Sequence, residues 1–81
     1  MAKQGKKLKS IKLNQLGNRI KELRIKKGFK NAEFFAYEHE INRSQYGKYE
    51  RGEDMRVSSL FKIIEVHNIS VEDFFKEGFE K

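Results

Sequence analysis

The stretch from Asn31 to Gly52 constrains the fold more than any other part of the chain. It reads NAEFFAYEHEINRSQYGKYERG, and it predicts two short helices over residues 31–38 and 43–51 that cross at a bend in residues 38–42. Asn31 and Asn42 are suitable N-caps of the two helices, and Gln45 stands three positions after Asn42, where a capping box has its partner. Five apolar residues of the stretch fall where one core would receive them, namely Phe35, Ala36, Ile41, Tyr46 and Tyr49.

Three further helices are predicted by apolar residues at three- and four-residue spacing. Leu16, Ile20 and Leu23 define one over residues 12–27, which Gly28 would end. The others span residues 58–67 and 71–77, with Ser58 and Ser70 as their N-caps. The chain contains no proline and only six glycines, which disfavours a many-stranded β fold. We therefore expect an all-α fold of five helices.

A length of 81 residues allows one domain with one small core. We expect a flexible basic arm over residues 1–11, the helical domain over residues 12–77 and a short tail over residues 78–81. The chain contains no cysteine, so neither disulfides nor a thiolate zinc site can form. No apolar run approaches the length of a membrane span, which predicts a cytoplasmic protein without a membrane partner.

The net charge of +6 is unevenly distributed. Residues 1–12 carry a charge of +5, residues 13–52 carry +4, and residues 53–81 carry −3. A basic front half and an acidic end favour binding of a polyanion on one face, although a solvated basic surface gives the same composition. The arm itself fits either a solubilising tail or a segment that follows a phosphate backbone.

No residue pattern points to catalysis. His39 and His67 are the only histidines, and no second metal ligand stands at a suitable spacing. A glycine-rich phosphate loop and a nucleophile elbow are both absent from the sequence. We expect no enzyme activity, no metal, no cofactor and no small-molecule ligand.

The chain from Leu16 to Phe75 resembles the Cro/repressor-type helix-turn-helix family, also called the XRE-like family. The residues that carry the resemblance are RIKELR from Arg19 with Lys27-Gly28, the small Ala36, SQYGKYERG from Ser44 to Gly52, and NISVEDF from Asn68. The resemblance implies a lambda-repressor-like bundle in which the helices at 31–38 and 43–51 form the helix-turn-helix. It also implies double-stranded DNA as the partner and a homodimer as the binding form.

The sequence departs from the family pattern beside the helix-turn-helix. Ala32 replaces a glutamine that contacts phosphate in many members, and the loop before it is one residue longer than usual. Glu40 replaces the usual glycine of the bend, which predicts a left-handed backbone at a non-glycine residue. Glu53 and Asp54 stand where many members are basic.

The N-terminal residues of a recognition helix enter the major groove, so the resemblance predicts base contacts by Asn42, Arg43, Ser44, Gln45 and Lys48. Arg43 suits guanine O6 and N7, while Gln45 suits adenine or phosphate and Lys48 suits guanine or the backbone. The predicted phosphate contacts are Lys30, Asn31, Arg51 and Arg56.

The resemblance also implies a structural ion pair and a dimer contact. Arg24 and Glu50 would form a partly buried pair that braces the first helix against the third. Phe74, Phe75 and Phe79 are candidate dimer contacts at the end of the chain.

The sequence therefore predicts a DNA-binding transcriptional regulator of a bacterium or phage, acting as a homodimeric repressor on a two-fold operator. The alternative is a protein-interaction module, such as an antitoxin, that binds its partner through the two C-terminal helices. RNA or single-strand binding is disfavoured because the sequence predicts no surface aromatics in a basic groove.

Overall fold

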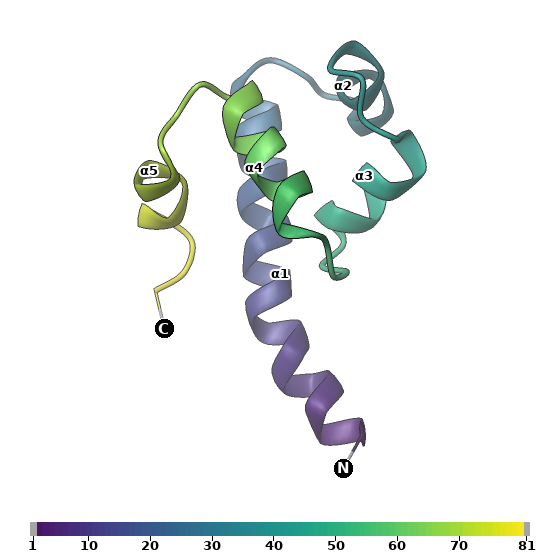
Figure 1. The fold of residues 1–81 in the computed structure, drawn as a ribbon, viewed down its shortest axis with the longest axis vertical. Coiled ribbons are helices and arrows are strands. Elements are labelled where there is room, and N and C mark those ends of the chain that lie inside the picture. The colour runs from purple at the N-terminus through teal and green to yellow at the C-terminus, as the bar shows by residue number, and fades with distance from the viewer. Residues whose placement is uncertain (1, 81) are drawn as a thin grey trace.

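The computed structural model describes the backbone of residues 2–80 and the side chains of residues 11–80. Five helices make up this part of the chain, and it contains no strand. Figure 1 shows the long α1 with α4 crossing it, α2 and α3 on one side and α5 on the other. The helices are α1 (Ala2–Lys26), α2 (Ala32–Glu38), α3 (Arg43–Glu50), α4 (Val57–Val66) and α5 (Val71–Lys76). The predicted all-α fold of five helices is confirmed.

Helix α1 begins at Ala2, ten residues before the expected start near residue 12. Residues 2–11 contain lysine, glutamine and leucine, which are good helix formers, and no proline interrupts them. The helix therefore continues through the stretch expected to be a flexible arm, and no element boundary separates the two. The side chains of Lys3, Lys6, Lys7 and Lys9 lie outside the described residues, so their predicted role stays a prediction.

Three of the four predicted N-caps are confirmed. The side chains of Asn31, Asn42 and Ser70 accept hydrogen bonds from the amides of Phe34, Gln45 and Asp73, respectively. The prediction of Ser58 as a cap was wrong. Helix α4 begins one residue earlier, with Arg56 at the N-cap and no side-chain cap bond, so Ser58 lies inside the first turn.

The core lies between the helices, and each of the five contributes to it. Five side chains are almost fully buried there: Ile20, Phe35, Tyr46, Ile63 and Phe74. The ring of Phe35 lies 5.1 Å from that of Tyr46, which joins α2 to α3. No helix of the described part is both long enough and apolar enough to cross a membrane.

The bend between α2 and α3 contains a residue in the left-handed region. Glu40 has a φ of 58°, as expected for a residue in place of the usual glycine. Lys62 of α4 donates a hydrogen bond to the Glu40 carbonyl over 3.0 Å. Since a left-handed residue other than glycine is strained, this contact supports the bend from outside.

Helices α1 and α3 approach most closely at Gly17. A Cβ atom at this position would lie 2.7 Å from the carbonyl oxygens of both Tyr49 and Glu50. Only glycine, which has no side chain, fits at this position between the two backbones. Sequence reasoning did not single out Gly17, because its spacing matches no motif.

Arg19 connects α5 to α1. Only 5% of this residue is exposed, and its guanidinium donates to the carbonyls of Phe74 over 2.6 Å and Asp73 over 2.9 Å. These carbonyls belong to the last turn of α5 and have no intrahelical partner. Phe74 is itself fully buried, so it serves the core of a single chain and was wrongly predicted as a dimer contact. Phe75 is exposed and Phe79 is half-buried, so both remain candidates.

Two histidines flank the ring of Phe35. His67 stacks on it with centroids 5.3 Å apart, and His39 lies 4.5 Å from it. Burial, together with the nearby positive charges of Lys27 and Arg19, lowers the pKa of His67 to about 4. Burial also lowers the pKa of His39. Both rings are therefore neutral in the folded protein at neutral pH.

We predict that Gly17→Ala lowers the free energy of unfolding by about 1–3 kcal/mol, because the new methyl group overlaps two backbone carbonyls. Gly47→Ala is the matched control on α3, since its Cβ would meet only the Arg51 side chain, at 3.4 Å. That variant should gain about 1 kcal/mol from helix propensity. Urea denaturation followed by circular dichroism measures both. Equal effects of the two substitutions would contradict the close approach at Gly17.

We also predict that the protein loses stability between pH 6.5 and 4. The folded pKa of His67 lies below its unfolded value, so the unfolded chain binds a proton first as the pH falls. The loss from this residue is at most about 3 kcal/mol, at about 1.4 kcal/mol per pH unit. His67→Phe retains a ring against Phe35 and should flatten the profile in urea denaturation. An unchanged slope in that variant would show that other groups cause the loss.

Candidate functional site

The N-terminal half of α3 presents a set of polar residues to solvent. Asn42, Arg43, Ser44, Gln45 and Lys48 are all exposed, and we call them the α3 polar face. The opposite side of the helix is anchored by Tyr46 and Tyr49, which are 0% and 7% exposed. The Asn42 cap fixes the first turn, because its Oδ1 accepts from the Gln45 amide over 2.9 Å. The polar face therefore projects from a helix that is held at its start and along its length.

Several surface hollows border the α3 polar face, and Asn42 and Gln45 line one of them together. Two of the others divide its residues. Asn42, Arg43 and Ser44 line one of them together with Glu33 of α2. Gln45 and Lys48 line the other, on the far side of the helix. Its remaining walls are residues of the segment that leads into α4, namely Glu53, Asp54, Met55, Arg56 and Ser59, with Tyr49 at its base. The predicted base-contact residues thus extend from the N-cap to the last turn of α3 and border both of its flanks.

An ion pair braces this helix from behind. Arg24 donates to both carboxylate oxygens of Glu50, over 2.7 and 3.0 Å, and to the carbonyl of Phe29 over 2.7 Å. The Glu50 carboxylate raises the pKa of Arg24, so the guanidinium stays charged. The two side chains are only 5% and 9% exposed. The pair joins the last turn of α1 to the last turn of α3.

The hydroxyls of the two α3 tyrosines differ in their surroundings. The Tyr49 hydroxyl donates to Gln45 Oε1 over 2.9 Å. The Tyr46 hydroxyl is buried without a hydrogen-bond partner among the described residues, close to the Arg24–Glu50 pair. Burial raises the pKa of Tyr46, which stays protonated. Only Tyr49 therefore connects the core to the α3 polar face.

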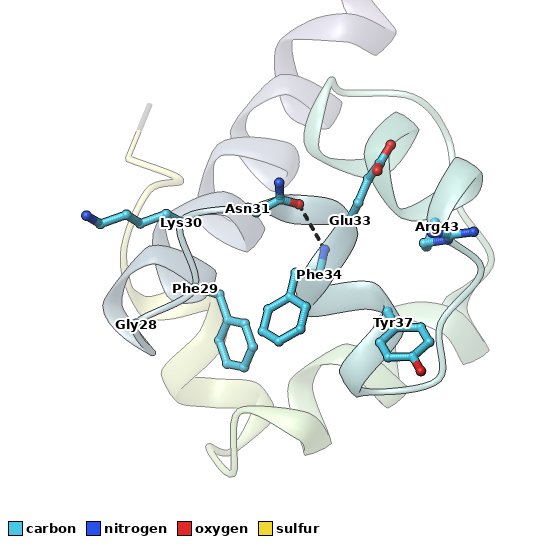
Figure 2. A pocket seen from close by; sticks show the side chains of 8 residues that line it. All are labelled: Gly28, Phe29, Lys30, Asn31, Glu33, Phe34, Tyr37 and Arg43. Atoms are coloured by element: carbon cyan, nitrogen blue, oxygen red, sulfur yellow. Dashed lines mark hydrogen bonds between the residues drawn. The ribbon is translucent and has the colours of Figure 1, made fainter.

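An open hollow of about 970 Å³ lies beside Arg43, between α2 and the loop before it. Figure 2 shows the rings of Phe29 and Phe34 side by side, with Lys30 and Arg43 at opposite ends. Phe34 and Tyr37 are 53% and 67% exposed. The prediction of no surface aromatics was therefore wrong, although the hollow that they line holds the carboxylate of Glu33 as well as the two cations. Helix α2 buries only Phe35 and Ala36, so its other aromatic side chains, Phe34 and Tyr37, lie in solvent.

The predicted phosphate contacts are all exposed but lie in three places. Lys30 and Asn31 line the aromatic hollow, where Asn31 Oδ1 also accepts from the Phe34 amide over 2.9 Å. Arg51 is the C-cap of α3, and Arg56 is the N-cap of α4. The described residues contain no group of three or more His, Asp or Glu side chains that would hold a metal ion.

Comparison with protein-family models, with curated proteins and with solved structures found no match.

We predict that Arg24→Ala lowers the free energy of unfolding by about 3 kcal/mol, because it leaves the Glu50 carboxylate partly buried without a partner. Lys21→Ala on the exposed side of α1 is the control and should change stability by less than about 0.5 kcal/mol. Thermal and urea denaturation measure both. A loss no larger than that of the lysine variant would show that the pair is dispensable.

Proposed function

We propose that this protein binds double-stranded DNA in a sequence-specific manner through a helix-turn-helix formed by α2 and α3. The observation that carries the proposal is the α3 polar face, which is exposed, capped and anchored by two buried tyrosines. A rigid helix end with an arginine, a lysine and a glutamine carries the side chains that read base edges in the major groove. The resemblance of residues 16–75 to the Cro/repressor-type family supports the same function.

In the proposed function, the protein acts as a homodimer on a two-fold operator and represses transcription by occupying it. Two copies would place two α3 helices in successive major grooves, about one helical turn apart. The exposed Phe75 and the half-buried Phe79, whose rings lie 5.0 Å apart, are the proposed dimer contacts. The function is one of binding, without a catalytic residue or a cofactor.

The alternative is a protein-interaction module. It is favoured by the apolar side chains that α4 and α5 leave in solvent, which are Val57, Phe61, Val71 and Phe75. Such a module would bind its partner through this face, and DNA binding would be secondary.

Fluorescence anisotropy separates the two functions. A labelled random duplex should bind with an affinity that falls with salt, with a slope equivalent to several phosphates. A single strand of equal length is the comparison, because the exposed rings of Phe34 and Tyr37 suit stacking. Absence of duplex binding at low salt would exclude the proposed function. Tighter binding of the single strand than of the duplex would indicate a single-strand-binding protein instead.

We predict that Arg43→Ala removes preference at one base pair of each half-site, by about 1–3 kcal/mol. The operator is first selected from a random duplex pool, and the affinities of single-base variants are then compared. Arg56→Ala is the control, since loss of a phosphate contact weakens all sequences by the same factor. A uniform loss in the Arg43 variant would make Arg43 a phosphate contact.

A further inference from the structure

Gln45 is the residue of the α3 polar face whose side chain is held by another side chain. Its Oε1 accepts the Tyr49 hydroxyl over 2.9 Å, one helical turn away. Arg43, Ser44 and Lys48 show no such bond within the described residues, so they keep their rotamer freedom. No described residue accepts a hydrogen bond from Gln45 Nε2. The amide is therefore fixed at its oxygen and free at its nitrogen.

The core determines where the Tyr49 hydroxyl lies. Only 7% of Tyr49 is exposed, and its ring belongs to the core. Its backbone carbonyl lies against Gly17 of α1, where no Cβ would fit. A buried ring on a backbone held this closely has little freedom, and Tyr49 also lines the hollow that Gln45 and Lys48 border. Tyr49 thus transmits the packing of α1 and α3 to a single exposed amide.

The bond changes what Gln45 offers to a ligand. A free glutamine reads adenine with both amide atoms, because its oxygen accepts from N6 and its nitrogen donates to N7. The bond with Tyr49 takes one lone pair of the oxygen and holds this atom toward its own helix, so the unbonded end of the side chain is the Nε2 amide group, which can only donate. Its matching partners in the major groove are acceptors, namely thymine O4 and guanine O6 or N7.

We propose that Tyr49 is a positioning residue that makes Gln45 a hydrogen-bond donor, so that Gln45 selects a base-edge acceptor and does not read adenine through both amide atoms. The inference rests on the proposed function and adds to it the chemistry of one base contact. If the bond between Tyr49 and Gln45 were purely structural, it would only stabilise α3 slightly, as side-chain pairs four residues apart on a helix do. The two roles differ because only positioning affects one base pair selectively.

Tyr49→Phe removes the hydroxyl and retains the ring. Gln45→Ala first identifies the base pair at which the selected duplex loses discrimination. At that pair we expect Tyr49→Phe to lower discrimination by about 2- to 10-fold, as for loss of one neutral hydrogen bond. In the Gln45→Ala background the same substitution should have no further effect, because the amide that it orients is gone.

Tyr46→Phe is the matched control. It is the same substitution on the same helix, but the hydroxyl that it removes is buried and does not reach the α3 polar face. It should leave every base preference unchanged. Denaturation of each variant in urea confirms that it is folded under the binding conditions.

A second measurement tests the donor role directly. At the base pair read by Gln45, the exocyclic amino group of adenine or cytosine is deleted by a base analogue in an otherwise unchanged duplex. The wild-type protein should bind this duplex with the same affinity, since the proposal gives the amino group no acceptor. Tyr49→Phe frees the oxygen and should make affinity sensitive to the deletion.

Three outcomes would overturn the inference. They are a wild-type loss of affinity on deletion of the amino group, an unchanged discrimination in Tyr49→Phe, and a loss in that variant that is equal for all sequences. In each case duplex binding itself persists, so the proposed function survives. If the wild-type protein binds no duplex, the proposed function fails and this inference fails with it.

Discussion

The contact between Gly17 of α1 and the backbone of α3 fixes the position of the helix that carries the α3 polar face. The carbonyls of Tyr49 and Glu50 fill the place of a missing side chain, so α1 and α3 lie closer than two helices with ordinary side chains would. The Arg24–Glu50 pair closes the same junction at one end. Since α3 has only eight residues, its stability comes from this packing and from its cap, and its intrinsic propensity contributes little.

A surface that selects a base sequence needs side chains held to within a fraction of an ångström. The α3 polar face meets this condition unequally. Gln45 is bonded to a core tyrosine, whereas Arg43 and Lys48 extend freely into their hollows. Long cationic side chains lose rotamer entropy on binding, and a preoriented amide loses little. In the proposed function, Gln45 would therefore contribute precise selection, and the two cations would contribute reach.

Local features of the fold could be predicted from the sequence, and tertiary ones could not. The caps at Asn31, Asn42 and Ser70 follow from residue type and position, because a cap bonds within its own first turn. The role of Arg19 depends on carbonyls of α5 more than fifty residues away, and no spacing rule connects them. The close approach at Gly17 was missed for the same reason. The five residues of the α3 polar face were predicted as a set, but their division between two flanks required the neighbouring helices.

Positive and negative charges nearly cancel around the proposed interface on α3. Arg43, Lys48, Arg51 and Arg56 contribute four positive charges around α3, and Glu33, Glu53 and Asp54 contribute three negative ones, so the local net charge is only +1. Residues 1–12, by contrast, carry +5 on the extension of α1. Attraction to a phosphate backbone depends on the number of cations that reach it. The surroundings of α3 are therefore nearly neutral, and the excess of positive charge lies in the first twelve residues of the sequence.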